Sequence, residues 1–247
     1  MSSGVRLLGL DFADLDVAAA ARAIAARPAA AQFAYVVTPN ADHLVRLRRT
    51  PALLPLYHAA AFCLLDSRVV RGAARALGLA APPVATGSDL TATLLRQHLA
   101  PGERITIIGL RPQHLPRLVA ACGLAPPAHY DPPMGFDGTA EGIRRAVDFV
   151  LAHPARLVFL AVGSPRQERL AAAIAATGQA TGTGLCIGAS LDFLAGVERR
   201  APRWAQRLGL EWLHRLAENP RRLGRRYIID NPPIFALLLR ERLAHRG

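Results

Sequence analysis

The sequence contains no lysine, and all 30 of its basic residues are arginine. A phosphate-binding loop of the G-x-x-x-x-G-K-[ST] type needs that lysine, so this class of nucleotide-binding protein is excluded. Cysteine is also scarce, since Cys63, Cys122 and Cys186 are widely separated and odd in number. They form neither a disulfide framework nor a C-x-x-C metal clip, which favours a reducing, cytoplasmic compartment.

Long hydrophobic runs are missing as well. No stretch approaches the ~20 apolar residues that span a bilayer. The longest late run, Pro232–Leu239, is far too short. The apolar start Val5–Leu10 is followed too soon by Asp11 and Asp14 to serve as the core of a secretory signal. We therefore expect a soluble or peripheral protein.

Signatures of metal and dinucleotide sites are absent too. The sequence has no H-E-x-x-H string and no cluster of His and Cys, so we expect no protein-bound metal and no cofactor. Gly182, Gly184 and Gly188 are one residue out of register for G-x-G-x-x-G, and they precede a predicted strand instead of following one. This mismatch weakens the alternative of a nucleotide-dependent oxidoreductase.

The chain does have a large apolar fraction and an uneven distribution of charge. With 247 residues, 51% of them hydrophobic, it is long enough for one α/β domain with an appendage. The net charge is +12, and residues 199–247 carry 12 arginines against four acidic residues, a net +8. We therefore divide the chain into a main domain, 1–198, and a basic appendage, 199–247.

Short apolar runs alternate with Ala-, Leu- and Arg-rich helical patterns along the main domain. The predicted strands are Val5–Leu10, Phe33–Val37, Phe62–Leu65, Ile105–Ile108, Leu157–Val162 and Leu185–Ile187. The predicted helices are Val17–Ala26, Ala41–Arg49, Val69–Leu77, Leu90–Leu99, Leu115–Ala121, Gly142–Leu151 and Gln167–Ala176. This alternation predicts an α/β fold, a Rossmann-like and mostly parallel sheet with helices on both faces.

Ligands of such sheets bind beyond the carboxyl ends of the strands. The residues that follow the predicted strands include Thr38, Asn40, Asp66, Gly163, Ser164, Gln167, Ser190 and Asp192. Helix capping is the structural alternative for Asn40, Ser164 and Ser190. Asp66 is harder to explain in this way, because a carboxylate at the end of an apolar strand costs free energy unless it has a partner or a task.

The appendage interleaves arginines with large apolar side chains such as Trp204 and Trp212. Arg215, Arg222 and Arg226 fall at i, i+7 and i+11, which is one face of a helix. Cationic helices with Trp and Leu suit an anionic membrane surface. A nucleic-acid binder that uses the same charge is the main alternative, but Trp and Leu fit lipid better than a phosphate track, so we expect no nucleic-acid partner.

Longer strings of the sequence resemble a known family. They are Val37-Thr38-Pro39-Asn40, Gly87-Ser88-Asp89-Leu90, Pro133-Met134-Gly135-Phe136, Gly163-Ser164-Pro165-Arg166-Gln167-Glu168, Ile187 to Gly196, Arg200 to Trp204, Gly209 to Leu216 and Pro220-Arg221-Arg222. Over nearly its whole length the chain resembles the WecG/TagA/CpsF glycosyltransferases, glycosyltransferase family twenty-six.

The resemblance implies a metal-independent, inverting enzyme. Such an enzyme moves a sugar from a UDP-sugar to a polyprenyl-diphosphate-linked saccharide in the synthesis of bacterial surface or teichoic-acid-type glycans. It would be cytoplasmic and peripheral on the inner face of the cell membrane. Family donors include N-acetylmannosamine and its uronic acid, and the sequence does not select among them. It also leaves open whether the chain forms a homo-oligomer.

The resemblance also implies roles for single residues. It makes Asp66 the general base and places Thr38 and Asn40 in the catalytic site. It makes Gln167 and Asp192 substrate-binding residues, together with the Gly163 and Ser164 that precede Gln167. From the charge pattern of the appendage we add Arg215, Arg222 and Arg226, which we expect to approach the diphosphates of donor or acceptor.

Two departures from the family pattern bear on these roles. Asp66 is followed by Ser67, where the family usually has glycine. Val84 lies about three residues before the Gly87-Ser88-Asp89-Leu90 string, where the family has an arginine that helps to hold the donor diphosphate. Arg68 or an arginine of the appendage is the candidate substitute. An inactive family member is the remaining alternative.

Overall fold

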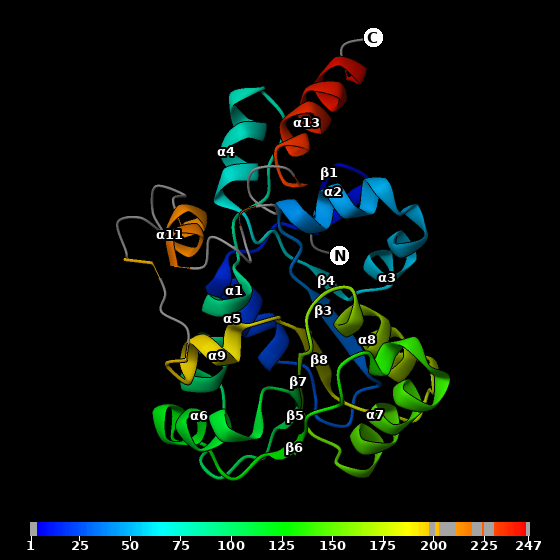
Figure 1. Cartoon of the computed structure of the whole chain (residues 1–247), viewed down its shortest axis with the longest axis vertical. Helices are drawn as coiled ribbons and strands as arrows, with labels where there is room; N and C mark the ends of the chain where they lie inside the picture. The colour runs from blue at the N-terminus through cyan, green and yellow to red at the C-terminus, as the bar shows by residue number, and fades with distance from the viewer. Residues whose placement is uncertain (1–3, 198–200, 203–210, 219–223, 225–229, 246–247) are drawn as a thin grey trace.

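The computed structural model of the chain describes residues 4–197, 201–202, 211–218, 224 and 230–245. Its centre is a six-stranded sheet in which all paired strands run parallel, in the order β4-β3-β8-β7-β5-β6 (Figure 1). The strands are β3 Ala34–Val37, β4 Phe62–Cys63, β5 Thr106–Gly109, β6 Ala128–Tyr130, β7 Leu157–Ala161 and β8 Thr183–Cys186. The prediction of an α/β fold with a parallel sheet is confirmed.

Successive side chains of the strands enter two separate hydrophobic cores. Tyr35 and Val37 of β3 belong to the first core, and Val36 between them belongs to the second. In β7, Val158 faces the first core and Phe159 the second. Both faces of the sheet are therefore covered, which explains why the strands read as nearly continuous apolar runs in the sequence.

Helices cover each of the two faces. Those around the first core include α2 Ala41–Arg49, α3 Leu54–His58, α4 Arg68–Ala76, α7 Ala140–Ala152 and α8 Arg166–Ala176. Those around the second core include α1 Val17–Ala25, α5 Gly87–Gln97, α6 Leu115–Cys122 and α9 Ser190–Leu194. All the crossovers between parallel strands bring the chain back over a face of the sheet, so the loops after the strands gather at one edge.

The predicted strand Val5–Leu10 is confirmed only over its first residues, and it is not part of the main sheet. Instead, β1 Gly4–Leu7 and β2 Leu10–Ala13 form a separate antiparallel hairpin. Leu8 and Gly9 make its turn with φ of 50° and 82°. A two-residue hairpin turn of this kind needs positive φ at both central positions. Only one of the two residues is glycine, so the turn is only weakly indicated by residue type.

The sequence prediction also misses β6. This strand has the sequence Ala-His-Tyr, it is half-buried throughout, and it lies at the edge of the sheet beside β5. Three half-buried residues with a histidine in the middle do not make an apolar run. The segment was therefore indistinguishable from a loop.

Within its described part, the appendage contributes α11 Glu211–Glu218 and α13 Pro233–Ala244. Ile234 and Leu238 of α13 are buried in the first core. The carboxylate of Glu241 accepts hydrogen bonds from the Leu8 backbone N–H, at 3.0 Å to Oε1 and 2.8 Å to Oε2. In Figure 1, α13 stands beside α4, with which it is in contact. None of the described helices has both the length and the apolar character needed to cross a bilayer.

Candidate active site

Asp66 follows β4 and lies against the first turn of α5. Leu65 forms a parallel bridge with Val84, and the Ala85 N–H donates to the Leu65 carbonyl at 2.9 Å. This short extension of the sheet brings Gly87 beside Asp66, whose Oδ2 accepts a hydrogen bond from the Gly87 N–H at 3.2 Å. The amino end of a helix carries partial positive charge, so α5 stabilises the negative charge of the carboxylate.

Two hydroxyls join Asp66 around Gly87. A methyl group added at Gly87 would lie 3.1 Å from Thr38 Oγ1, 3.4 Å from Ser190 Oγ and 3.7 Å from Asp66 Oδ2. Both hydroxyls donate to backbone carbonyls at or just after the end of β8, at 3.2 Å for Thr38 and 2.6 Å for Ser190. The ends of β3, β4 and β8 therefore meet here, and the structure brings the predicted residues Thr38 and Asp66 together.

The three candidate helix caps behave differently from one another. Asn40 does cap α2, because its Oδ1 accepts hydrogen bonds from two N–H groups in the first turn of that helix, at 3.1 and 3.4 Å. Ser164 and Ser190 cap no helix, since α8 and α9 begin without a side-chain cap. The structural alternative is confirmed for Asn40 and wrong for the two serines. A catalytic contribution of Asn40 stays a prediction.

Gln167 is the second residue of α8, and its side chain faces inward. The side chain is only 2% exposed. Its Oε1 accepts a hydrogen bond from the Gly188 N–H at 2.9 Å, and its Nε2 donates to Glu168 Oε1, also at 2.9 Å. The amide thus ties α8 to the loop after β8. Contact between Gln167 and a donor stays a prediction.

Glu168, the next residue, is a buried carboxylic acid for which sequence reasoning gave no role. It is 1% exposed, and its Oε2 has no hydrogen-bond partner. Burial raises the pKa of the Glu168 carboxyl above its ordinary value, although the hydrogen bond from Gln167 and the nearby Arg46 guanidinium oppose this shift. A sequence pattern does not reveal such a residue, because its burial arises only from the packing of α8.

Ser164 is held from the side of α2 by Arg46. The guanidinium Nη1 donates to Ser164 Oγ at 3.0 Å, and Nη2 forms an ion pair with Asp42. The Tyr57 hydroxyl lies 3.4 Å from the same serine oxygen. Burial raises the pKa of Tyr57 well above its ordinary value, so this phenol is neutral. Arg46 is a polar residue of this edge that the sequence analysis missed.

Asp192 lies on α9 and pairs with a histidine. Its Oδ1 is 3.1 Å from His114 Nδ1, a hydrogen-bond distance. His114 ends η2 (Pro112–His114), the short helix after β5. The pair therefore links α9 to the end of another strand of the sheet. A substrate contact of Asp192 stays a prediction.

Of the three appendage arginines expected near the diphosphates, only one belongs to the described residues. Arg222 and Arg226 lie outside the described residues, and Arg215 belongs to α11. Val84, in the position of the family arginine, is half-buried against the first core and pairs with Leu65. An apolar side chain thus lies beside Leu65, the residue that precedes Asp66, in the position of the family arginine.

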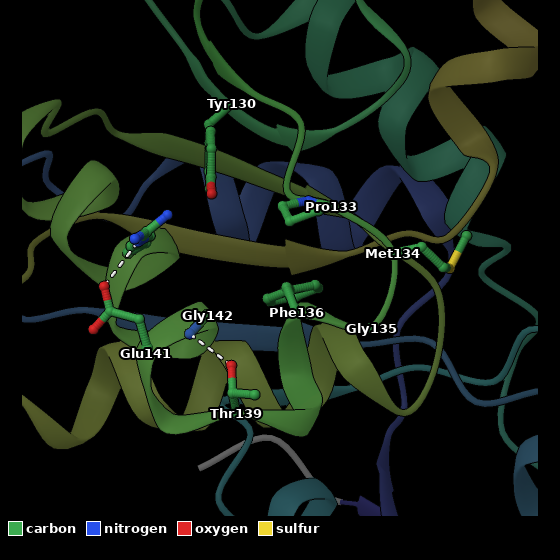
Figure 2. A pocket seen from close by; sticks show the side chains of 9 residues that line it. Tyr130, Pro133, Met134, Gly135, Phe136, Thr139, Glu141 and Gly142 are labelled. Carbon is green, nitrogen blue, oxygen red and sulfur yellow. Dashed lines mark hydrogen bonds and ion pairs between the residues drawn. The ribbon is translucent and has the colours of Figure 1, made fainter.

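A cavity of about 280 Å³ lies at the end of β6 (Figure 2). Tyr130 and the Pro133–Phe136 loop form one part of its wall, and the start of α7 forms the other. Figure 2 shows Tyr130 and Phe136 on opposite sides of the hollow. Glu141 and Arg145, which also line it, form an ion pair at 2.8 Å. The Pro133–Phe136 string, which carried part of the family resemblance, therefore lines a hollow at the carboxyl edge of the sheet.

Two kinds of polar group thus occur along this edge. A carboxylate with hydroxyls can accept a proton from a substrate hydroxyl, and arginines near Gly163 can bind an anion. In the part of the chain that the structure describes, no three His, Cys, Asp or Glu side chains come together in a group that could hold a metal ion.

A parallel α/β sheet with reactive polar groups at its carboxyl edge is the architecture of a class of enzymes that bind their substrates in the crevice beyond the strands. The model of the WecG/TagA/CpsF family of glycosyl transferases matches residues 5–247. The chain therefore belongs to this family and is a glycosyltransferase. In general terms, its substrates are a sugar donor and a glycan acceptor.

Proposed function

We propose that this glycosyltransferase moves a sugar from a UDP-sugar to a polyprenyl-diphosphate-linked saccharide, with inversion at the sugar carbon and without a bound metal. The observation that carries the proposal is the position of Asp66, a half-buried carboxylate beside Gly87 and Thr38 at the carboxyl edge of the sheet. Family membership supports the reaction class. The product would be a bacterial surface polysaccharide or a teichoic-acid-type glycan.

The proposed reaction needs a base. An acceptor hydroxyl oxygen attacks the anomeric carbon, on the face opposite the diphosphate, while the bond from that carbon to the diphosphate oxygen breaks. UDP leaves with the electron pair, and the hydroxyl proton passes to the Asp66 carboxylate. Thr38 and Asn40, at the end of the neighbouring strand, would orient the donor sugar or the acceptor.

The donor would lie along the carboxyl edge of the sheet. The cavity of about 280 Å³ is close to the lower limit of about 300 Å³ for small-molecule pockets. Tyr130 and Phe136 offer ring surfaces for a flat base. With the nucleoside there, the donor would extend past Gly163 and Ser164 toward Asp66. Gln167 and Asp192 remain our candidates for further substrate contacts.

We also propose that the enzyme works at the inner face of the cell membrane. Phe235, Leu239 and Leu243 are exposed by 52, 49 and 58% and recur every four residues, so they form one stripe along α13. Ile234 and Leu238 anchor the same helix in the first core. An apolar stripe on a basic segment suits an anionic lipid surface. Arg215, Arg222 and Arg226 of the appendage would then approach the diphosphates.

Substitution of the stripe tests this membrane role. We expect Phe235→Ser with Leu239→Ser to reduce flotation with anionic liposomes several-fold and to leave the Tm unchanged, because both side chains are solvent-exposed. The matched control is Val197→Ser, an exposed apolar residue of the main domain (38%). Binding by the unaltered chain should also weaken with added salt. Full flotation of the double variant would remove the stripe from the proposal.

A turnover assay tests the proposed reaction. The full chain is incubated in the presence of a chelator with a panel of UDP-sugars and a short-chain polyprenyl-diphosphate glycan, and UDP release and lipid-linked product are measured. We expect turnover with one or a few of the sugars. Absence of product with every sugar, together with absence of UDP binding by calorimetry, would refute the proposal. UDP binding without turnover would instead favour an inactive family member.

A further inference from the structure

The proposed function requires a cationic partner for the donor diphosphate, whose negative charge rises as UDP leaves. Val84 occupies the position of the family arginine, so that partner is unassigned. The inference below rests on the proposed function. It concerns Arg166, the first residue of α8, which comes directly after the turn that follows β7.

The guanidinium of Arg166 lies over the backbone of the turn. A Cβ atom added to Gly163 would be 3.3 Å from Arg166 Nη2. The Nη1 group donates to the sulfur of Met134, at 3.0 Å, and Met134 belongs to the loop that lines the cavity in Figure 2. Arg166 therefore spans the space between the candidate nucleoside cavity and the Gly163 turn.

The surroundings of the Arg166 guanidinium differ from those of two nearby arginines, Arg46 and Arg169. Arg46, which also contacts this turn, is paired with Asp42. Arg169, one helical turn along α8, pairs with Asp137 at 3.2 Å. Among the residues that the structure describes, no carboxylate lies within ion-pair distance of Arg166. Its hydrogen-bond partner is the Met134 thioether, which is a weak acceptor and carries no charge.

We infer that Arg166 binds the diphosphate of the UDP-sugar and stabilises the UDP leaving group. Its planar fork can donate two parallel hydrogen bonds to phosphate oxygens, and a ligand anion would replace the weak contact with Met134. Gly163, with φ of 77° and no side chain, leaves the backbone beside the guanidinium open to a close approach. The amino end of α8 adds favourable partial charge at the same place.

The test compares Arg166→Gln with Arg169→Gln, a matched control that removes the same charge from the same helix. Affinities for uridine, UMP, UDP and inorganic pyrophosphate are measured by calorimetry with a chelator present. We expect Arg166→Gln to weaken UDP and pyrophosphate binding by about 10- to 100-fold, as the loss of charge-assisted hydrogen bonds implies, and to leave uridine binding unchanged. Arg169→Gln should bind all four as the unaltered chain does.

A bracing role for Arg166 predicts another pattern. If the arginine only holds the Met134 loop over the cavity, Arg166→Gln should weaken uridine and UDP to the same extent. That result, or UDP binding equal to that of Arg169→Gln, would overturn the inference. Arg166→Lys serves as a second variant if the glutamine variant melts early, and it should recover part of the pyrophosphate affinity. If the unaltered chain binds neither uridine nor UDP, the proposed function itself fails.

Discussion

Two neighbouring parts of the carboxyl edge of the sheet carry different chemical groups. Where β3, β4 and β8 end, a carboxylate and two hydroxyls surround Gly87. Where β7 ends, arginines gather: Arg46 holds Ser164, and Arg166 lies over Gly163. The first group of side chains can accept a proton, and the second can bind an anion.

This difference indicates that proton removal occurs beside Gly87 and that the diphosphate is bound beside Gly163. Proton removal and departure of the diphosphate occur at different atoms of the substrates, so one enzyme needs both kinds of group at some distance from each other. If the division holds, substitutions around Gly87 should lower kcat, and substitutions around Gly163 should change affinity for the diphosphate.

The largest effect is expected for Asp66→Asn. The amide keeps the shape of the carboxylate and cannot accept the acceptor proton, so kcat should fall by roughly 10²–10⁴ while UDP binding stays nearly the same. Asp148→Asn is the control, since Asp148 is a surface carboxylate on α7 that pairs with Arg144 at 3.0 Å. Near-normal turnover by the Asp66 variant would rule out this residue as the base.

A smaller effect is expected for Gly87→Ala. The added methyl would lie between Thr38 and Asp66, at 3.1 Å from the threonine oxygen, so kcat should fall by about tenfold or more through displacement of these groups. Gly72→Ala on α4 is the control, because nothing lies within 4 Å of its added methyl. It should raise stability by about 0.5–1 kcal/mol, as Gly-to-Ala does in a helix, with unchanged activity. Equal kcat for both variants would show that Gly87 is not at the site of reaction.

The smallest effect concerns stability and Glu168. Because burial raises the pKa of its carboxyl above 4.5, the folded state holds this proton more tightly than the unfolded state. The associated stability is complete below pH 4.5 and is lost as the pH rises toward the folded-state pKa. Glutamine does not ionise, so Glu168→Gln avoids the loss of stability that the charged, buried carboxylate causes. The Tm of the variant should therefore exceed that of the unaltered chain at pH 8 and approach it near pH 4.

Glu103→Gln should change the Tm at pH 8 in the opposite direction. The hydrogen bond from Arg156, at 2.7 Å, lowers the pKa of the Glu103 carboxyl. Its contribution to stability is therefore present near neutral pH and lost in acid. The glutamine variant should have a lower Tm than the unaltered chain at pH 8. If both variants shifted the Tm at pH 8 in the same direction, the sign assigned to Glu168 would be wrong.

Much of the fold could be predicted from the sequence because the strands of the main sheet are buried on both faces. Leu157–Ala161, for example, is an unbroken apolar run, and it forms β7. The hairpin at Leu8 and Gly9 and the edge strand β6 could not be predicted in this way. Their geometry depends on a positive φ at a leucine and on pairing with β5, and neither leaves an apolar pattern.

The candidate site likewise has one part that the sequence predicts and another that it does not. Parallel neighbouring strands end at the same edge, so the sequence alone predicts that Thr38 and Asp66 lie together. The inward position of Gln167, the burial of Glu168 and the contact of Arg166 with Met134 depend on how α8 packs against distant loops. Residue type and spacing along the chain carry no information on such contacts.

The division of roles between these two parts of the edge is tested most directly by the affinity of two variants for UDP. The affinities are measured by calorimetry with a chelator present. The account predicts that Asp66→Asn binds UDP within about twofold of the unaltered chain and that Arg166→Gln binds it at least about tenfold more weakly. The reverse order, with UDP lost in Asp66→Asn and retained in Arg166→Gln, would contradict the account.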